Sequence, residues 1–256
     1  MLVCLLLALV LAAAAIALLR PRTTPHPPVV QHDPVSGEFN DEFSGSSLDP
    51  AWTREKGPGY GLGTFEATPD LTRLDGQGHL VVSAQKQPDG QWHAGMVSTR
   101  RSFTLNSGVI EVRAKVPRSQ GAWPAIWLIN TLQGKLHSEI DMMENVSGSK
   151  TLYSTIHDWT VDPQKGYHKE ADLSPGWHTY RLTWTPTSIA FALDGKSMGQ
   201  FTSSTIKPWV YTEPLFIVLD VAVGGSWAGP PDASTPDRLE MLVDYVRVRP
   251  LGGKAS

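Results

Sequence analysis

Three carboxylates lie close together in the segment His137–Asn145, which otherwise has the composition of a β-strand. Alternation along a regular strand puts Glu139 and Asp141 on one face and Glu144 on the other. One extra residue at Met142–Met143, in a β-bulge, would bring all three acids to the same face. Two carboxyl groups on one face suit cleavage of a glycosidic bond, in which one attacks or activates and the other protonates the leaving oxygen.

Two other interpretations of this acidic segment stay open. The three acids could belong to a solvated edge strand, or they could bind a divalent metal together with His137. Glycosidic cleavage with retention requires carboxyl groups about 5 to 5.5 Å apart, and a concave sheet could bring Glu139 and Glu144 together to that extent. Asp141 between them would hydrogen-bond to the attacking carboxylate and influence which acid keeps a proton.

Aromatic residues surround the acidic segment. Of the nine tryptophans, Trp123 and Trp127 lie directly before it, and an indole ring offers a flat apolar face for the C–H face of a sugar. An even spacing puts both on one face of a strand, although Pro124 between them interrupts a regular pattern. We expect Trp123 to line a cleft, with one of the two rings able to serve as core instead. His157, in the next expected strand, could hydrogen-bond to Glu144 or to a sugar hydroxyl.

The rest of the chain reads as a series of strands. Short runs rich in β-branched and aromatic residues are separated by turn signals, and no long run holds a helical period. We therefore predict an all-β fold, and the strand spacing favours a two-sheet sandwich. The clearest expected strands are Leu80–Ala84, Val109–Val116, Tyr180–Trp184, Ile189–Leu193 and Leu242–Val248.

The chain divides into four parts by composition. Residues 1–20 are almost entirely apolar and predict a signal peptide or a membrane anchor, so we expect a secreted or extracytoplasmic membrane-anchored protein. Residues 21–36 form a Pro-rich linker, residues 37–251 the folded domain, and residues 252–256 a tail. Contact with a membrane is expected only through the first segment, if it is not cleaved.

Charge and cysteine content exclude several classes of protein. A net charge of -3 provides no basic surface for nucleic acid. The single cysteine, Cys4, lies in the first apolar segment, so the domain has none for a disulfide, a zinc site or a thiol nucleophile. We expect a monomer that is stabilised by packing and needs no cofactor for catalysis.

Five ordered blocks resemble glycoside hydrolase family 16, particularly its laminarinase-like branch with the signature Glu-x-Asp-x-x-Glu. The blocks are the acidic segment Glu139–Glu144, Gly121–Leu128, Gly176–Tyr180, Ala222–Trp227 and Val243–Val248.

The resemblance implies a concanavalin A-like jelly-roll sandwich with a concave substrate cleft. It implies Glu139 as nucleophile, Asp141 as its assisting acid and Glu144 as general acid/base. Trp227 of the fourth block joins the expected substrate-binding residues. The resemblance also implies a possible structural calcium near Asp244, for which an ordinary hydrogen-bonded strand residue is the alternative.

The expected function is retaining, endo-acting hydrolysis of a polysaccharide, most simply a β-1,3-glucan. The bulged spacing is similar to that of β-1,3-glucan enzymes, but agar and carrageenan enzymes share it. Alternatives are a non-catalytic glucan-binding module and a transglycosylase that remodels a wall polysaccharide. Two departures from the family pattern stand out: Leu132–Ser138 replaces a Trp-containing approach to the nucleophile, and Asp220 stands where the family usually has Asn.

Overall fold

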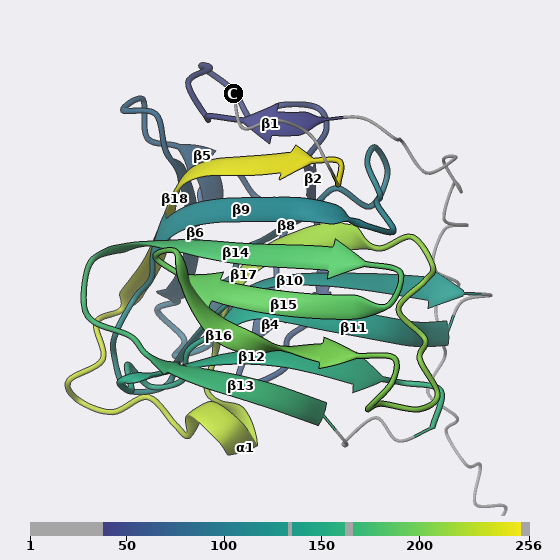
Figure 1. The fold of residues 1–256 in the computed structure, drawn as a ribbon. Helices are drawn as coiled ribbons and strands as arrows, with labels where there is room; N and C mark the ends of the chain where they lie inside the picture. Colours follow the sequence, from purple (N-terminus) through teal and green to yellow (C-terminus); the bar gives the residue numbers. More distant parts are fainter. Residues whose placement is uncertain (1–37, 133–134, 162–165, 252–256) are drawn as a thin grey trace, which may run out of the picture.

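The computed structural model describes residues 38–132, 135–161 and 166–251 (Figure 1). The predicted leader 1–20, the linker 21–36 and the tail 252–256 lie outside the described residues and stay predictions. No helix within the described ranges has the length and apolar character needed to cross a lipid bilayer.

The regular structure of the described chain consists of two β-sheets and one helical turn, as the strand pattern predicted. The larger sheet has eleven strands: β1 (Phe39–Asp41), β3 (Gly57–Pro58), β4 (Thr64–Phe65), β5 (Thr72–Leu74), β6 (Leu80–Lys86), β7 (Trp92–Ala94), β9 (Gly108–Lys115), β14 (Trp177–Thr185), β15 (Ser188–Leu193), β16 (Lys196–Thr202) and β18 (Arg238–Arg249). The smaller sheet has seven: β2 (Thr53–Arg54), β8 (Met96–Ser98), β10 (Ala122–Leu132), β11 (Lys135–Glu144), β12 (Thr151–Asp158), β13 (Gly166–Asp172) and β17 (Phe216–Val223).

The two sheets form a jelly-roll sandwich because their strands bury one face. Burial alternates strictly along β14 and β15, so every second side chain enters the space between the sheets. Trp184 and Leu182 are fully buried there, in the same core cluster as Ile126, Leu128 and Ile140 of the other sheet. Each such side chain contributes about 1.5–3 kcal/mol through removal of its apolar surface from water.

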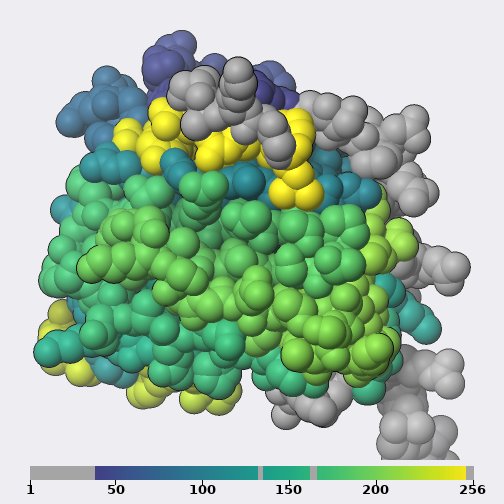
Figure 2. Space-filling view, in the orientation of Figure 1, coloured from purple at the N-terminus to yellow at the C-terminus, as the bar shows by residue number. Residues whose placement is uncertain are grey.

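Sequence neighbours are seldom sheet neighbours in this fold. The smaller sheet runs β13-β12-β11-β10-β17-β8-β2, so the late strand β17 enters between β10 and β8. In the larger sheet β18 pairs with β9 and β6, and Figure 2 shows its yellow surface beside the teal surface of a segment from much earlier in the chain. The acidic strand β11 thereby lies near the middle of the smaller sheet, held on both sides.

A short loop of the larger sheet crosses to the smaller one. Leu62 donates its backbone N–H to the carbonyl of Val223, and a Cβ placed on Gly61 would lie 2.2 Å from the same carbonyl oxygen. Glycine is therefore required for this close approach. The loop carries Tyr60, whose ring lies 6.3 Å from that of Trp123 and 5.9 Å from that of Trp127.

Candidate active site

A β-bulge in β11 brings the three acids to one face of the smaller sheet. Against β12, Asp141 lies opposite Thr155 and Glu144 opposite Tyr153, with a register shift between the two pairs. Two residues separate these acids on β11, but only one separates their partners on β12. Since Tyr153 and Thr155 point to the same face, so do Asp141 and Glu144.

The neighbouring strand β10 confirms where the extra residue lies. Ile126 pairs with Met143 and Trp127 pairs with Asp141, so Met142 has no partner of its own. Met142 and Met143 are both buried in the core, as is Ile140. The bulge that we predicted at Met142–Met143 is therefore present, and apolar anchors on the other face hold it.

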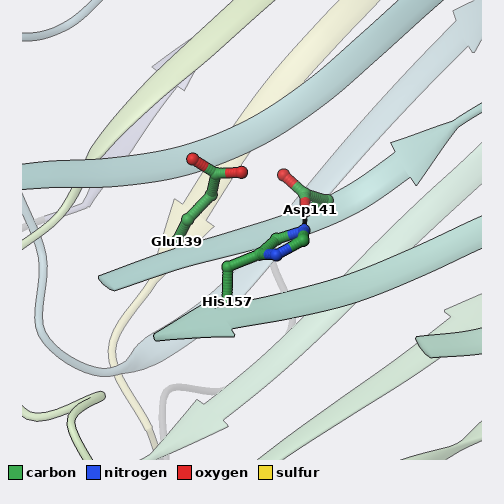
Figure 3. A group of neighbouring side chains, drawn as sticks. All are labelled: Glu139, Asp141 and His157. Atoms are coloured by element: carbon green, nitrogen blue, oxygen red, sulfur yellow. Dashed lines mark ion pairs between the residues drawn. The ribbon is translucent and has the colours of Figure 1, made fainter. Parts of the chain in front are cut away.

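Glu139, Asp141 and His157 point toward one another from two adjacent strands (Figure 3). One potential ligand atom of each lies within 4.8 Å of those of the other two. His157 Nε2 lies 3.3 Å from Asp141 Oδ2, whereas the partners considered for it from the sequence were Glu144 and a sugar hydroxyl. The reason is the register, which places His157 opposite Glu139 and away from Tyr153, the partner of Glu144.

Burial and mutual repulsion favour protonation of this acid group. Removal from water raises the pKa of Glu139 well above its usual range, and the charge of Asp141 raises it further. Burial likewise raises the pKa of Asp141, followed by the charges of Glu144 and Asp220. The pKa of Glu144 is raised by burial and lowered by its hydrogen bond from Trp123. The site can therefore keep a proton for transfer at a pH where an exposed carboxyl group would have lost it.

Each glutamate accepts a hydrogen bond from an indole N–H. Trp123 Nε1 donates to Glu144 Oε1 over 3.0 Å, and Trp159 Nε1 donates to Glu139 Oε2 over 3.1 Å. Trp123 is half-buried, in agreement with its expected place at the site. Sequence reasoning missed Trp159, although its position directly after the His157 strand was a usable signal.

Trp127 serves a different purpose from the one predicted. It shares a face with Trp123, because β10 pairs with β17 without interruption through Pro124. However, it is only 9% exposed, and its Nε1 donates to Asp220 Oδ1 over 2.8 Å. This burial and the hydrogen bond favour the core alternative for Trp127 over the expected contact with substrate.

Burial favours the protonated form of Asp220 at neutral pH. The residue is 1% exposed, and burial raises the pKa of its carboxyl group to about 8 despite the hydrogen bond from Trp127. Its Oδ2 atom has no hydrogen-bond partner among the described residues. A protonated Asp220 resembles the amide of asparagine in shape and in donor and acceptor pattern.

Trp227 lies on the single helical turn α1 (Gly225–Ala228), and it is 43% exposed. Its ring centroid is 5.3 Å from that of Trp123 and 5.3 Å from that of Tyr153. Together with Tyr60, these rings form an aromatic group beside Glu144. The predicted position of Trp227 near the acids is thus consistent with contact to a sugar ring.

Asp244 lies away from the acids, on the larger sheet. Its Oδ2 is 2.5 Å from Arg113 Nη1, so the carboxylate already has a cationic partner. This contact agrees with the alternative of an ordinary hydrogen-bonded strand residue, and the calcium ion stays a prediction. The metal alternative named His137, but within the described ranges the acids group with His157 and not with His137.

Comparison with known proteins agrees with this geometry. The family model described as glycosyl hydrolases family 16 matches residues 65–247. A β-glucanase of Rhodothermus marinus is 28% identical over 241 residues, which cover 82% of this chain and 83% of that protein.

Two solved structures share the fold. The laminarinase catalytic domain of Thermotoga maritima is 26% identical, with a TM-score of 0.75 over 82% of this chain and 96% of that one. The endo-β-1,3-glucanase of Pyrococcus furiosus is 30% identical, with a TM-score of 0.74 over 82% of this chain and 92% of that one. The bulged acidic strand, its sandwich and the family match lead to one conclusion: the chain belongs to glycosyl hydrolases family 16.

Proposed function

We propose that this protein hydrolyses internal β-1,3 linkages of a glucan by double displacement, with retention of configuration at the anomeric carbon. The observation that carries the proposal is the bulge in β11, which puts Glu139 and Glu144 on the same face of one strand. Similarity to a laminarinase and to an endo-β-1,3-glucanase supports glucan as the polymer.

The contacts of the two glutamates support their separate roles. Glu139 accepts the indole N–H of Trp159, and this contact and the nearby His157 both lower its pKa and so favour the charged carboxylate. Glu144 accepts the N–H of Trp123 and is buried, so it can hold a proton. Glu139 is therefore the nucleophile, and Glu144 is the general acid and base.

The reaction takes place in two steps. Glu139 attacks the anomeric carbon while Glu144 protonates the departing glycosidic oxygen, which leaves a glycosyl ester on Glu139. Glu144, now ionised, then takes a proton from water, and the water oxygen displaces Glu139. Asp141 donates to Glu139 when it holds the shared proton, and His157 Nε2 lies 3.3 Å from Asp141 Oδ2.

Incubation of the purified protein with laminarin, lichenan and agarose tests the proposal. Laminarin should yield a ladder of oligosaccharides, and Glu139→Gln should reduce the rate by at least about 10³-fold. Glu213→Gln, the same change at an exposed glutamate, is the matched control and should leave the rate unchanged. Binding of laminarin with no product would indicate a glucan-binding module, and products longer than the starting oligosaccharide would indicate transglycosylation.

Export, a monomeric state and bound calcium stay predictions. Residues 1–20, from which export was predicted, precede the described part of the chain. Action outside the cytoplasm agrees with a polymeric substrate, which does not cross membranes unaided.

A further inference from the structure

Trp159 is the only tryptophan of the described residues for which a hydrogen bond to Glu139 is observed. The acidic motif does not indicate Trp159, because this residue follows β12 and lies neither in the acidic strand β11 nor directly before it. Its Nε1 lies 3.1 Å from Oε2 of Glu139. The indole of Trp159, which has no role in the mechanism above, thus contacts the carboxylate that forms the glycosyl ester.

The backbone fixes the position of this indole. Trp159 donates its backbone N–H to the carbonyl of His137 over 3.0 Å, which continues the β11–β12 pairing by one step beyond Ser138 and Asp158. Its ring centroid lies 6.0 Å from that of His157, with the planes 33° apart. The side chain is therefore held between the strand ladder and a second ring of the site, and this arrangement aims the N–H at Glu139.

The surroundings of Glu139 leave few groups that favour its charged form. On its own strand Asp141 and Glu144 repel the charge, and burial opposes it more strongly than either. His157 on β12 and the indole N–H of Trp159 act in the opposite direction. The phenols of Tyr60 and Tyr211, from two loops, also lie within electrostatic range of Glu139, and both stay neutral because burial raises their pKa.

We propose that Trp159 is a further catalytic residue, whose indole N–H keeps the Glu139 carboxylate ionised and oriented for attack. This role rests on the proposed function of Glu139 as nucleophile. The charge on Glu139 disappears when its oxygen bonds to the anomeric carbon, and it returns when water displaces that oxygen in the second step. Because a hydrogen bond is stronger to a charged acceptor, the indole assists the second step, in which the carboxylate leaves.

The variant Trp159→Phe keeps an aromatic face for stacking and removes only the donor. We expect the midpoint of the acid limb of the pH profile of kcat/KM to rise by about one pH unit. This limb reports the pKa of the nucleophile in the free enzyme, and loss of a donor to the charged carboxylate raises that pKa. With an aryl β-laminarioside, whose first step is fast, kcat should fall about 10-fold and KM should fall with it as the glycosyl ester accumulates. Loss of stacking alone would raise KM.

A matched control and a restoring variant accompany this measurement. Trp209→Phe removes an indole N–H that donates to the carbonyl of Pro186, remote from the acids, and should leave the profile unchanged. Trp159→His restores a ring donor and should recover part of the shift. A Trp159→Phe enzyme with the wild-type acid limb and with wild-type values of both kcat and KM would overturn the proposal.

A second measurement uses the unmodified protein and needs no activity. In protein labelled with ¹⁵N-tryptophan, the Nε1–H resonance of Trp159 should titrate with the same midpoint as the acid limb of kcat/KM. A resonance that does not move between about pH 3 and 8 would refute the contact with an ionising Glu139. Absence of any product from wild-type protein would instead refute the proposed function, so the two failures can be told apart.

Discussion

The substitution Asp220→Asn should change how stability depends on pH. Asparagine keeps the shape of the protonated acid and its acceptor for Trp127, but it cannot ionise. In the folded protein the pKa of Asp220 is raised to about 8, against 3.8 for an unperturbed aspartate. Between these values the folded chain binds a proton at this position and the unfolded chain does not, so wild-type stability falls as pH rises.

The size of the effect follows from proton linkage. Each pH unit within that window costs the wild type about 1.4 kcal/mol of unfolding free energy, so Asp220 lowers stability by about 3 kcal/mol between pH 5 and pH 7. The Asp220→Asn variant lacks this loss. Its stability relative to wild type should therefore increase by about the same amount over that range.

Urea unfolding followed by tryptophan fluorescence at pH 5, 6 and 7 measures this difference. Asp232→Asn is the control: hydrogen bonds from the side chain and the backbone of Ser234 lower the pKa of that exposed carboxyl group, so its contribution is constant over this range and is lost only at lower pH. A stability difference between the Asp220→Asn variant and wild type that does not change with pH would refute the conclusion that Asp220 is protonated.

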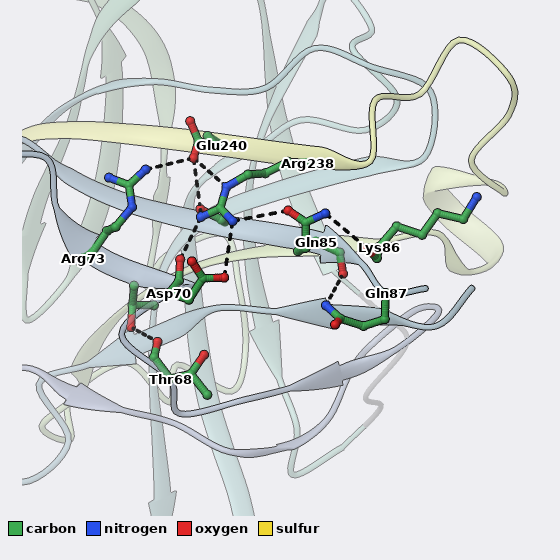
Figure 4. A network of polar contacts seen from close by, with 10 residues as sticks. Thr68, Asp70, Arg73, Gln85, Lys86, Gln87, Arg238 and Glu240 are labelled. Atoms are coloured by element: carbon green, nitrogen blue, oxygen red, sulfur yellow. Dashed lines mark hydrogen bonds and ion pairs between the residues drawn. The ribbon is translucent and has the colours of Figure 1, made fainter. Parts of the chain in front are cut away.

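Three further substitutions test separate parts of the structure. Trp227→Ala should raise KM about 10-fold with kcat retained, measured on laminarin, because it removes an exposed ring beside Trp123 without touching an acid. Gly166→Ala should lower kcat/KM by roughly 10-fold, because a Cβ at this position would lie 2.7 Å from His157 Cε1 and would displace the imidazole ring. The control Gly57→Ala should leave kcat/KM unchanged, because a Cβ there meets nothing within 4 Å. Arg238→Met should lower the free energy of unfolding by about 1–3 kcal/mol, measured by urea unfolding. The reason is that the Arg238 guanidinium joins β18 to β6 and to the preceding loop (Figure 4), through hydrogen bonds that it donates to Asp70, Ser83, Gln85 and Glu240. Unchanged stability would contradict this role.

The acidic strand and its bulge could be predicted because they depend on local sequence. Strand alternation predicts which face of the strand each acid occupies. The extra residue of the bulge at Met142–Met143 then brings Glu144 to the face of the other two acids. The expected strand Ile189–Leu193 was likewise found, within β15, because its alternating pattern matches its one-sided burial. Local pattern is therefore sufficient for elements whose burial repeats along the chain.

Contacts between distant strands could not be predicted in the same way. Trp159 reaches Glu139 only because β12 pairs with β11 in one register, and Tyr60 reaches the site because a loop of the larger sheet docks on β17. The pairing of Asp244 with Arg113 and of Trp127 with Asp220 also joins different strands. Such pairs depend on strand order, which a single sequence does not specify.

The most direct test of the double displacement is to trap its covalent intermediate. A 2-deoxy-2-fluoro-β-laminaribiosyl fluoride forms the glycosyl ester but slows its hydrolysis, so the labelled enzyme can be digested and its peptides identified by mass spectrometry. We predict that the added mass is found on Glu139. A label on Glu144, or an active enzyme that takes no label and releases product of inverted configuration, would contradict the assignment.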